Sequence, residues 1–364
     1  MHGSTNVAVL EKGYLGGGGT GRNTAIVRSN YLTPEGARFY DASRELFQGL
    51  SKELDFNLFY SERGHFTMAH SPASLRTQRW RAETNKHLGI DSEVVSPQFI
   101  KRKIPEIDLT CGGHQAPIYG ALYHPPGAIA RHDAVAWAYA RGADSRGVEI
   151  HQRTGVTGID VRNGQVEGVQ TTQGPIKTRQ VLSAVAGWTT HITKMVGVRT
   201  PLVVHPLQAL VTEPLKPWLH SIVVSASLHC YLSQSSRGEL VAGASLDPYE
   251  LISQRSTLEF AETLGGHMLD LFPCLGQINV MRQWAGLCDM TPDFSPIMGR
   301  TPIEGFFIDA GWGTWGFKAT PISGYTMAHT IAHGEEHKLI RAFTLGRFAE
   351  FQLVGEKGAA SVGH

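Results

Sequence analysis

The order of apolar and polar positions along the chain predicts a mixed fold of short strands and amphipathic helices. Residues 6–11 and 306–308 are short apolar, β-prone runs, whereas residues 34–54 repeat their apolar positions at helical spacing. Three helices are predicted to open on the same signal, a hydroxyl residue that caps the first turn followed by proline at the first helical position. These signals are Thr33-Pro34, Ser71-Pro72 and Ser96-Pro97.

Residues 147–187 carry the clearest β pattern. Asn163-Gly164 separates two alternating runs, which is the strongest short-range signal for a hairpin, and Gln173-Gly174 marks a second turn. We therefore expect a β-meander that returns into a strand, the arrangement with which glutathione-reductase-type flavin domains cover their dinucleotide. Gly187 would let the end of that strand pack against the adenine side.

A strand, a glycine-rich turn and a helix follow one another at residues 306–334. Gly311, Gly313 and Gly316 open a turn in which backbone can approach a ligand closely, and Lys318 is the one cation in this loop. A glycine loop that leads into a helix N-terminus presents free N–H groups and a positive dipole end, which suits an anionic or electron-rich ligand. This strand–loop–helix unit is typical of a flavin protein in which such a segment closes over the flavin ring.

The limits of this last helix are predicted from the same capping rules. Thr320 stands where an N-cap belongs, Pro321 at the first helical position and Gly334 just past the end. Apolar positions at helical spacing predict its buried face. They are Ile322, Tyr325, Ala328 and Ala332.

The N-terminal region contains half of a dinucleotide-binding unit. Its first strand ends in Glu11, and in Rossmann-type units such an acid holds the hydroxyls of the adenosine ribose. The usual G-x-G-x-x-G turn should lie upstream of this strand, but the chain starts at Met1. The glycine run 16–19 follows the second strand rather than the first, so it is not that turn. We therefore expect a Rossmann domain that is truncated at its N-terminus.

Composition narrows the function classes. The chain has 364 residues, 41% hydrophobic and 18% charged, with a net charge of +1, so nothing favours nucleic acid or a membrane surface as a partner. No apolar run is long enough to span a membrane and no signal peptide is visible, so a cytoplasmic location is expected. The four cysteines are scattered, and His329 and His333 lack an apparent third ligand, so no metal site is predicted.

We expect an α/β (α+β) fold made of interleaved parts. An FAD-binding domain of glutathione-reductase-type Rossmann architecture is predicted to be interrupted by an inserted antiparallel-sheet substrate domain. The FAD-binding domain comprises residues 1–45, 127–201 and 284–345, the substrate domain residues 46–126 and 202–283, and the C-terminal tail residues 346–364.

Seven segments, in this order, carry a family resemblance that runs nearly from end to end. They begin at Val7-Ala-Val-Leu-Glu, Arg22-Asn-Thr-Ala-Ile-Val-Arg, Ala130-Arg-His-Asp, His205-Pro-Leu-Gln, Trp284-Ala-Gly, Gly311-Trp-Gly-Thr-Trp-Gly-Phe-Lys and Glu356-Lys-Gly. The chain resembles the D-amino-acid oxidase-like flavoprotein family, and within it the beta subunits of heterotetrameric sarcosine oxidases. Beta-like subunits of related dehydrogenases for N-methyl amino acids, proline and opines are the closest competitors.

The resemblance implies that FAD is bound noncovalently in this subunit. Glu11 would hold the ribose, and further residues would lie near the pyrophosphate, the ribityl chain or the ring edge. These residues are Arg22, Asn23, Thr24, Gly313 and Thr314. Monomeric relatives attach FAD to a cysteine, but Cys288 is offset from that position by two residues, so we predict no cysteinyl flavin and a plain buried thiol.

The resemblance also implies a covalent FMN at the interface with the alpha subunit. The tether is the histidine of the segment Ala130-Arg-His-Asp, which is His132. The alternative is that His132 merely precedes a helix and faces solvent.

The implied substrate is sarcosine or a similar small N-methyl amino acid, whose carboxylate needs fixed cations. The family pattern supplies Arg28, which offers a bidentate fork, and Lys318, which offers a point charge beside the flavin ring. Surface cations are the alternative, since Arg and Lys are usually exposed. Neither residue stands in a run of charges.

The implied reaction oxidises sarcosine to glycine and a one-carbon unit, either formaldehyde or methylene-folate. A hydride passes to FAD, and electrons pass through FMN to oxygen, which becomes hydrogen peroxide. The implied partners are the alpha, gamma and delta subunits of a heterotetramer. Two alternatives stay open: a related dehydrogenase for another N-methyl amino acid, proline or an opine, and an inactive truncated fragment.

Overall fold

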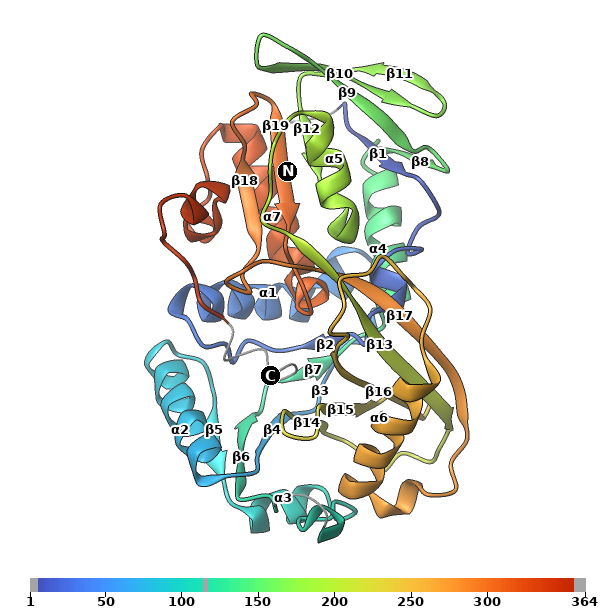
Figure 1. The fold of residues 1–364 in the computed structure, drawn as a ribbon, viewed down its shortest axis with the longest axis vertical. Coiled ribbons are helices and arrows are strands. Elements are labelled where there is room, and N and C mark those ends of the chain that lie inside the picture. The colour runs from blue at the N-terminus through green and yellow to red at the C-terminus, as the bar shows by residue number, and fades with distance from the viewer. Residues whose placement is uncertain (1–5, 114–116, 357–364) are drawn as a thin grey trace.

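The computed structural model describes residues 6–113 and 117–356, and Figure 1 shows an upper and a lower part with helix α1 (Pro34–Glu53) between them. The start at Met1 and residues 357–364 of the predicted tail lie outside the described residues. Thr33 caps α1 as predicted, because its hydroxyl accepts a hydrogen bond from the Gly36 amide at 3.1 Å. The same start, a capping serine before proline, opens α2 (Pro72–His87) and α3 (Pro97–Lys103).

The upper part contains parallel strand pairs. β1 (Ala8–Glu11) pairs with β8 (Glu149–Gln152), and β12 (Val181–Ser183) pairs with β19 (Phe306–Ala310), whose other edge carries the antiparallel strand β18 (Ile297–Arg300). Among the described residues these strands form two separate sheets, one of two strands and one of three. The helices of this part are α4 (His132–Asp144), α5 (Thr189–Met195) and α7 (Gly316–His333) (Figure 1).

An antiparallel meander of β9 (Val156–Arg162), β10 (Gln165–Thr171) and β11 (Gly174–Lys177) stands at the top of Figure 1. The predicted hairpin turn is confirmed, because Asn163 and Gly164 have φ of 51° and 77°, the paired positive values of a type I′ turn. Its apolar face packs against β19 and α5, which seats the meander on the parallel strands.

The lower part is built on one sheet of eight strands, antiparallel throughout except where β14 lies parallel to β4. Across the sheet the strands are β17 (Val280–Met290), β13 (Val203–Pro214), β16 (Glu239–Leu246), β15 (Cys230–Gln234), β14 (Ile222–Ser225), β4 (His65–Ala69), β6 (Gly120–His124) and β5 (Glu93–Val95). Helix α6 (Leu258–Leu271) covers one face with Leu264 and Met268, which pack with Phe66 and Leu232 in the largest buried apolar cluster.

A small sheet joins the two parts. β7 (Ala128–Ile129) lies between β2 (Ile26–Val27) and β3 (Ser61–Glu62) and is antiparallel to both. The pairing continues beyond the strands, since the Ala130 amide donates to the Ala25 carbonyl at 3.0 Å. The chain around β2 therefore runs beside the start of α4.

Helix α7 begins earlier than predicted. Its first residue is Gly316, so Thr320 and Pro321 lie inside the helix and the predicted N-cap at Thr320 is wrong. The proline is tolerated because the Thr320 hydroxyl donates to the Phe317 carbonyl at 2.8 Å, the acceptor that the missing Pro321 amide would have used. The predicted end is confirmed, since Gly334 has a left-handed φ of 73°.

The predicted buried face of α7 is also wrong except at Ile322. Tyr325 is 46% exposed, whereas Thr326 and Thr330 are fully buried. Their hydroxyls donate to the carbonyls one turn back, Thr326 to Ile322 at 2.8 Å and Thr330 to Thr326 at 2.9 Å. A threonine whose hydroxyl is satisfied by its own helix can be buried at little cost, and an apolar-spacing rule overlooks it.

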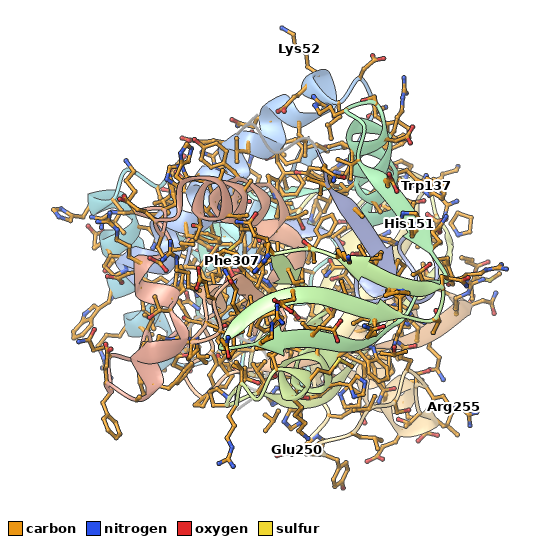
Figure 2. The ribbon with its side chains drawn as sticks, turned by 90° about the horizontal axis from the view of Figure 1, so that it is seen from above. Lys52, Trp137, His151, Glu250, Arg255 and Phe307 are labelled. Carbon is orange, nitrogen blue, oxygen red and sulfur yellow. The ribbon has the colours of Figure 1, made fainter. Side chains whose placement is uncertain are left out.

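These elements make the mixed α/β fold that the sequence predicts, with an antiparallel sheet beside parallel strand pairs. In Figure 2, Phe307 of β19 lies inside the molecule, while Lys52, Glu250 and Arg255 stand at its margin. Three predicted boundaries cut through elements, at 45/46 inside α1, at 283/284 inside β17 and at 345/346 inside the short 3-10 helix Leu345–Phe348. The division into domains stays a prediction.

Candidate active site

Arg28 leaves strand β2 directly and is buried, with 7% of its surface exposed. Its Nη1 donates to Asn30 Oδ1 at 2.9 Å, and its guanidinium carbon lies 4.6 Å from the centre of the Tyr31 ring. A hydrogen bond within the same segment and an aromatic face together hold the guanidinium in one orientation.

Lys318 lies in the first turn of α7 and is equally buried. Its Nζ donates to the Thr314 carbonyl at 3.5 Å, and the Ser43 hydroxyl of α1 donates to the Lys318 carbonyl at 2.6 Å. Burial first, and then the charge of Arg28, lower the pKa of Lys318 well below its usual range. The structure thus brings the two predicted carboxylate ligands near enough for their like charges to repel, and a bound anion would relieve this repulsion.

Strand β4 borders this cation pair with one face. His65 and Thr67 alternate with Phe66 and Met68, which belong to the apolar cluster under the sheet, so the polar pair points the other way. His65 Nδ1 and Thr67 Oγ1 are buried and have no hydrogen-bond partner among the described residues. Burial, then Arg28, lowers the pKa of His65 well below its usual range, with smaller effects of three further basic side chains.

Two carboxylates fix the glycine loop that precedes α7. Asp289 accepts from the Gly311 amide at 2.6 Å with its side chain and from the Gly313 amide at 3.0 Å with its carbonyl. Asp309 accepts from Trp312 Nε1 at 2.8 Å. Burial raises the pKa of each carboxyl to about 6.

The glycines of this loop are required by close packing as well as by conformation. Gly313 has a φ of 51°, and a Cβ there would lie 2.7 Å from the sulfur of Met290. A Cβ at Gly311 would lie 2.6 Å from Cγ2 of Thr291. The loop therefore holds one shape between β19 and α7, with Thr314 half-buried beside it.

The N-terminal candidates lie along one stretch of chain. Glu11 ends β1 and accepts from the Gly13 amide at 2.6 Å. Arg22 donates to the Gly18 carbonyl at 3.0 Å and also to that of Gly17, so its side chain closes the glycine run. Asn23 Oδ1 accepts from the Ala25 amide at 2.7 Å. Arg22 and Asn23 thus shape this loop, and their contacts with FAD stay predictions.

Thr24 and Gly187 both meet the eight-stranded sheet. The Thr24 hydroxyl is hydrogen-bonded to the Tyr231 phenol of β15. Gly187 lies in the short turn after β12, where a Cβ would approach Cβ of Leu287 to 2.8 Å. Glycine is therefore needed at 187 because a side chain there would collide with Leu287 on β17. The predicted position of Gly187 beside adenine stays a prediction.

His132 is the first residue of α4 and is half-buried, and both its role as a tether and the solvent-facing alternative stay untested. Arg131 and Asp133 form an ion pair on either side of it. Burial lowers the pKa of His132; Asp133 opposes this and Arg131 reinforces it. The imidazole is therefore neutral at physiological pH, with a ring nitrogen free of a proton.

Three further observations bear on alternative sites. Within residues 6–113 and 117–356 no group of three or more His, Cys, Asp or Glu side chains is placed to hold a metal. None of the helices in that part of the chain is long and apolar enough to cross a membrane. A surface hollow of about 560 Å³ lies at the far end of β19, beside Gly305 and Phe306, and contains none of the predicted site residues.

Comparison with known proteins decides the family. The FAD dependent oxidoreductase family matches residues 2–330. The sarcosine oxidase beta subunit of Arthrobacter sp is 43% identical over 363 residues, which cover 100% of this chain and 89% of that protein. The chain belongs to the FAD dependent oxidoreductase family, among the sarcosine oxidase beta subunits. This confirms the resemblance that the seven segments carry.

Other members of the family support the same assignment. The sarcosine oxidase beta subunit of Rhizobium meliloti (strain 1021) is 43% identical over 98% of this chain and 85% of that protein. The crystal structure of L-proline dehydrogenase from P. horikoshii has a TM-score of 0.90 at 26% identity, covering 96% of this chain and 92% of that one. The family supports FAD as cofactor, and these relatives support flavin-dependent oxidation of an amine.

The residues present fit the flavin end of FAD. The glycine loop leads into α7, an 18-residue helix whose first amides point out of the helix end. Beside it stand a buried ammonium with a single long hydrogen bond among the described residues and the unpartnered Thr67 hydroxyl and His65 nitrogen. Buried polar groups normally have partners, so this donor set is incomplete without a polar ligand.

Sequence reasoning missed His65, Thr67 and Arg81. The first two could have been found, because polar residues at alternate positions of an otherwise apolar strand mark a polar face. Arg81 is 3% exposed but gave no such signal. Helix α2 is rich in polar residues along its length, and Arg79, two positions earlier, is exposed.

Proposed function

We propose that this chain is the FAD-binding subunit of a sarcosine-oxidising enzyme and converts sarcosine to glycine and a one-carbon unit. The observation that carries the proposal is that Arg28 and Lys318 are both buried beside the glycine loop, where their like charges repel. It stands in a chain 43% identical to a protein named sarcosine oxidase subunit beta. The carboxylate of a small amino acid is an anion that matches one guanidinium and one ammonium.

The chain's own residues would bind and orient the substrate. The carboxylate would lie between Arg28 and Lys318, and its charge would favour the protonated form of Lys318 Nζ against the effect of burial. Binding would therefore raise the pKa of this amine. The oriented N-methyl group would face the glycine loop, with Thr67 and His65 available to the amine or the carboxylate.

FAD supplies a two-electron acceptor for the hydride that leaves the N-methyl carbon. Loss of that hydride and of the amine proton turns the substrate into an imine. Water adds to the imine carbon, and cleavage of the C–N bond gives glycine and formaldehyde. Transfer of the same carbon to folate in a partner subunit would give methylene-folate instead.

We also propose that His132 holds FMN covalently at an interface with an alpha subunit. A half-buried imidazole with a lowered pKa has a proton-free nitrogen for a bond to the flavin 8-methyl carbon. The two displaced hydrogens, one from that carbon and one from the imidazole, would reduce the flavin, and oxygen would reoxidise it. FMN would pass electrons to oxygen and so yield hydrogen peroxide. Assembly with alpha, gamma and delta subunits and a cytoplasmic location belong to the same proposal.

A second candidate is the oxidation of L-proline. The TM-score of 0.90 to an L-proline dehydrogenase favours it, since proline is also a secondary amine beside a carboxylate. The two substrates differ in the carbon that loses hydride, an exocyclic methyl group or a ring carbon.

Turnover by the chain co-expressed with its partner subunits separates these candidates. We expect a kcat/KM for sarcosine at least tenfold above that for L-proline, with glycine and formaldehyde as products in the absence of folate. The reverse preference would reject the sarcosine proposal. Acid precipitation tests the FMN: flavin in the pellet that is lost in His132→Ala supports the tether, and flavin only in the supernatant rejects it.

A further inference from the structure

The segment 28–33 carries Arg28 but forms neither helix nor strand. Side chains from distant elements satisfy its backbone instead. His124 Nε2 lies 3.3 Å from the Ser29 amide, Asn85 Nδ2 donates to the Tyr31 carbonyl at 2.9 Å, and Glu356 accepts from the Leu32 amide at 3.0 Å. Since each anchor is buried, the segment is held in one conformation by contacts that a solvent-exposed loop would lack.

Asn30 is the link between this segment and the substrate site. Its Oδ1 accepts from Arg28 Nη1 at 2.9 Å, and its carbonyl accepts from the same nitrogen at 3.3 Å. The carbonyl also accepts Arg81 Nε at 2.7 Å and a second hydrogen bond from Arg81 Nη2. The Asn30 carbonyl oxygen therefore accepts hydrogen bonds from two buried guanidinium groups. The bond from Arg81 Nε is shorter than the bond from Arg28 Nη1.

Arg81 reaches this carbonyl from α2, on the side of the lower sheet. The Arg81 side chain is buried, so its hydrogen bonds must offset the free energy that is lost when its charge is removed from water. Burial, and then Arg28, lower the pKa of Arg81 to about 9, while Glu356 opposes the shift. The charge of Arg81 thus repels Arg28 while its hydrogen bonds fix the residue that orients Arg28.

We propose that Arg81 is a positioning residue for the substrate carboxylate, because it fixes Asn30 and thereby the position of Arg28, which donates two hydrogen bonds to Asn30. The inference rests on the proposed role of Arg28. Without Arg81, the Asn30 carbonyl would keep Arg28 as its one guanidinium donor, the like-charge repulsion would vanish, and Arg28 would move toward Asn30 and away from the carboxylate. Arg81 itself touches no reacting atom.

The experiment compares Arg81→Met with Arg79→Met, a matched control on the exposed side of the same helix. KM and kcat for sarcosine are measured in the flavin-loaded complex, together with FAD content. Acetate, a bare carboxylate, is titrated against the flavin absorption spectrum and against the melting temperature, two readouts that need no turnover. We expect Arg81→Met to raise KM and the Kd for acetate about tenfold or more, the usual effect of losing hydrogen bonds to a charged group, with kcat and FAD content little changed.

Unchanged KM and Kd in a folded, flavin-loaded Arg81→Met protein would overturn the proposal, as would equal losses of kcat and FAD content at constant KM. If that variant fails to fold, Arg81→Lys decides, because lysine keeps the charge but loses the fork, and an unaltered acetate Kd would again contradict the role. If the wild-type complex does not oxidise sarcosine, the proposed function fails, while the acetate titration still tests Arg81.

Discussion

At the scale of single residues, the molecule keeps charges where water cannot solvate them. Arg28, Arg81 and Lys318 are each at most 7% exposed, and Arg28 lowers the pKa of both other cations. Glu356 is a buried acid that opposes this for Arg81. Such an excess of like charge is costly in the free protein, and a bound carboxylate would reduce the cost. The residues that bind substrate are therefore expected to weaken the fold.

Lys318→Met tests this expectation in both directions. Because the pKa of Lys318 is lowered in the folded protein, the amine costs stability at low and neutral pH, and the cost disappears as pH rises toward its usual range. Removing the amine should raise the free energy of unfolding at neutral pH by roughly 1 kcal/mol while raising KM for sarcosine about 10- to 100-fold. Denaturant unfolding and steady-state kinetics measure the two effects. A variant that is both less stable and unaltered in KM would disprove this account of Lys318.

Asp309→Asn tests the buried carboxyl behind the glycine loop. Its pKa of about 6 lies above the usual value for Asp, so the folded state binds more protons between about pH 4 and pH 6, and stability falls as pH rises through that window. Asparagine keeps the acceptor for Trp312 without the charge. We expect the variant to be more stable than wild type by about 1 kcal/mol at pH 7.5 and no more stable at pH 4. Equal differences at both values of pH would refute the raised pKa.

At the scale of elements, a buried ion pair holds the segment that follows α7 against the rest of the fold. Arg347 and Asp293 are 2% and 1% exposed and meet through two hydrogen bonds of 2.8 Å. Asp293 also accepts from the Val354 amide at 3.0 Å, and the Glu356 amide donates to the Asp293 carbonyl at 3.0 Å. This carboxylate thus secures the stretch that delivers Glu356 to the segment beside Arg28.

Asp293→Ala should therefore be among the most destabilising substitutions in the chain. Removing one partner of a buried ion pair leaves the other charge uncompensated, which typically costs about 3–5 kcal/mol. The control is Glu167→Ala, which breaks an exposed pair with Arg162 and should cost less than about 1 kcal/mol. Urea denaturation of both variants measures the difference. Similar losses in the two would mean that Asp293 and Arg347 do not anchor this segment.

At the scale of the whole molecule, the site lies where the two parts of the fold meet. Arg28 leaves the small joining sheet, Lys318 comes from the first turn of α7, and His65 and Thr67 come from the eight-stranded sheet. The eight-stranded sheet supplies two polar atoms without a hydrogen-bond partner among the described residues, His65 Nδ1 and Thr67 Oγ1, and the charges of Arg28 and Lys318 repel each other. A ligand between them would satisfy both, which explains why neither part alone makes a site.

The sequence could predict the local units of this arrangement. The capped start of α1, the turn at Asn163-Gly164 and the end of α7 at Gly334 each depend on neighbouring residues, so their patterns are readable. The start of α7 could not be predicted, because the hydroxyl of Thr320 compensates for proline inside the helix. The capping pattern at Thr320-Pro321 predicts a helix start, but the hydrogen bond from the Thr320 side chain allows the helix to begin at Gly316.

The site was predictable only through the family resemblance. Arg28 and Lys318 are separated by most of the chain, and nothing local reveals that their charges come near enough to repel. Arg81 and Glu356 act on the segment after Arg28 through contacts that only the folded chain creates. Periodicity reports which side of an element is buried, and it does not report which buried polar groups meet.

The most direct test of the central claim is the anaerobic bleaching of bound flavin by sarcosine, in the wild-type complex and in Arg28→Met and Lys318→Met. The account predicts rapid and complete reduction of FAD in the wild type, with half-saturating sarcosine raised at least tenfold in both variants while their FAD content is unchanged. FAD that stays oxidised in the wild type, or variants that saturate at the wild-type concentration, would contradict it.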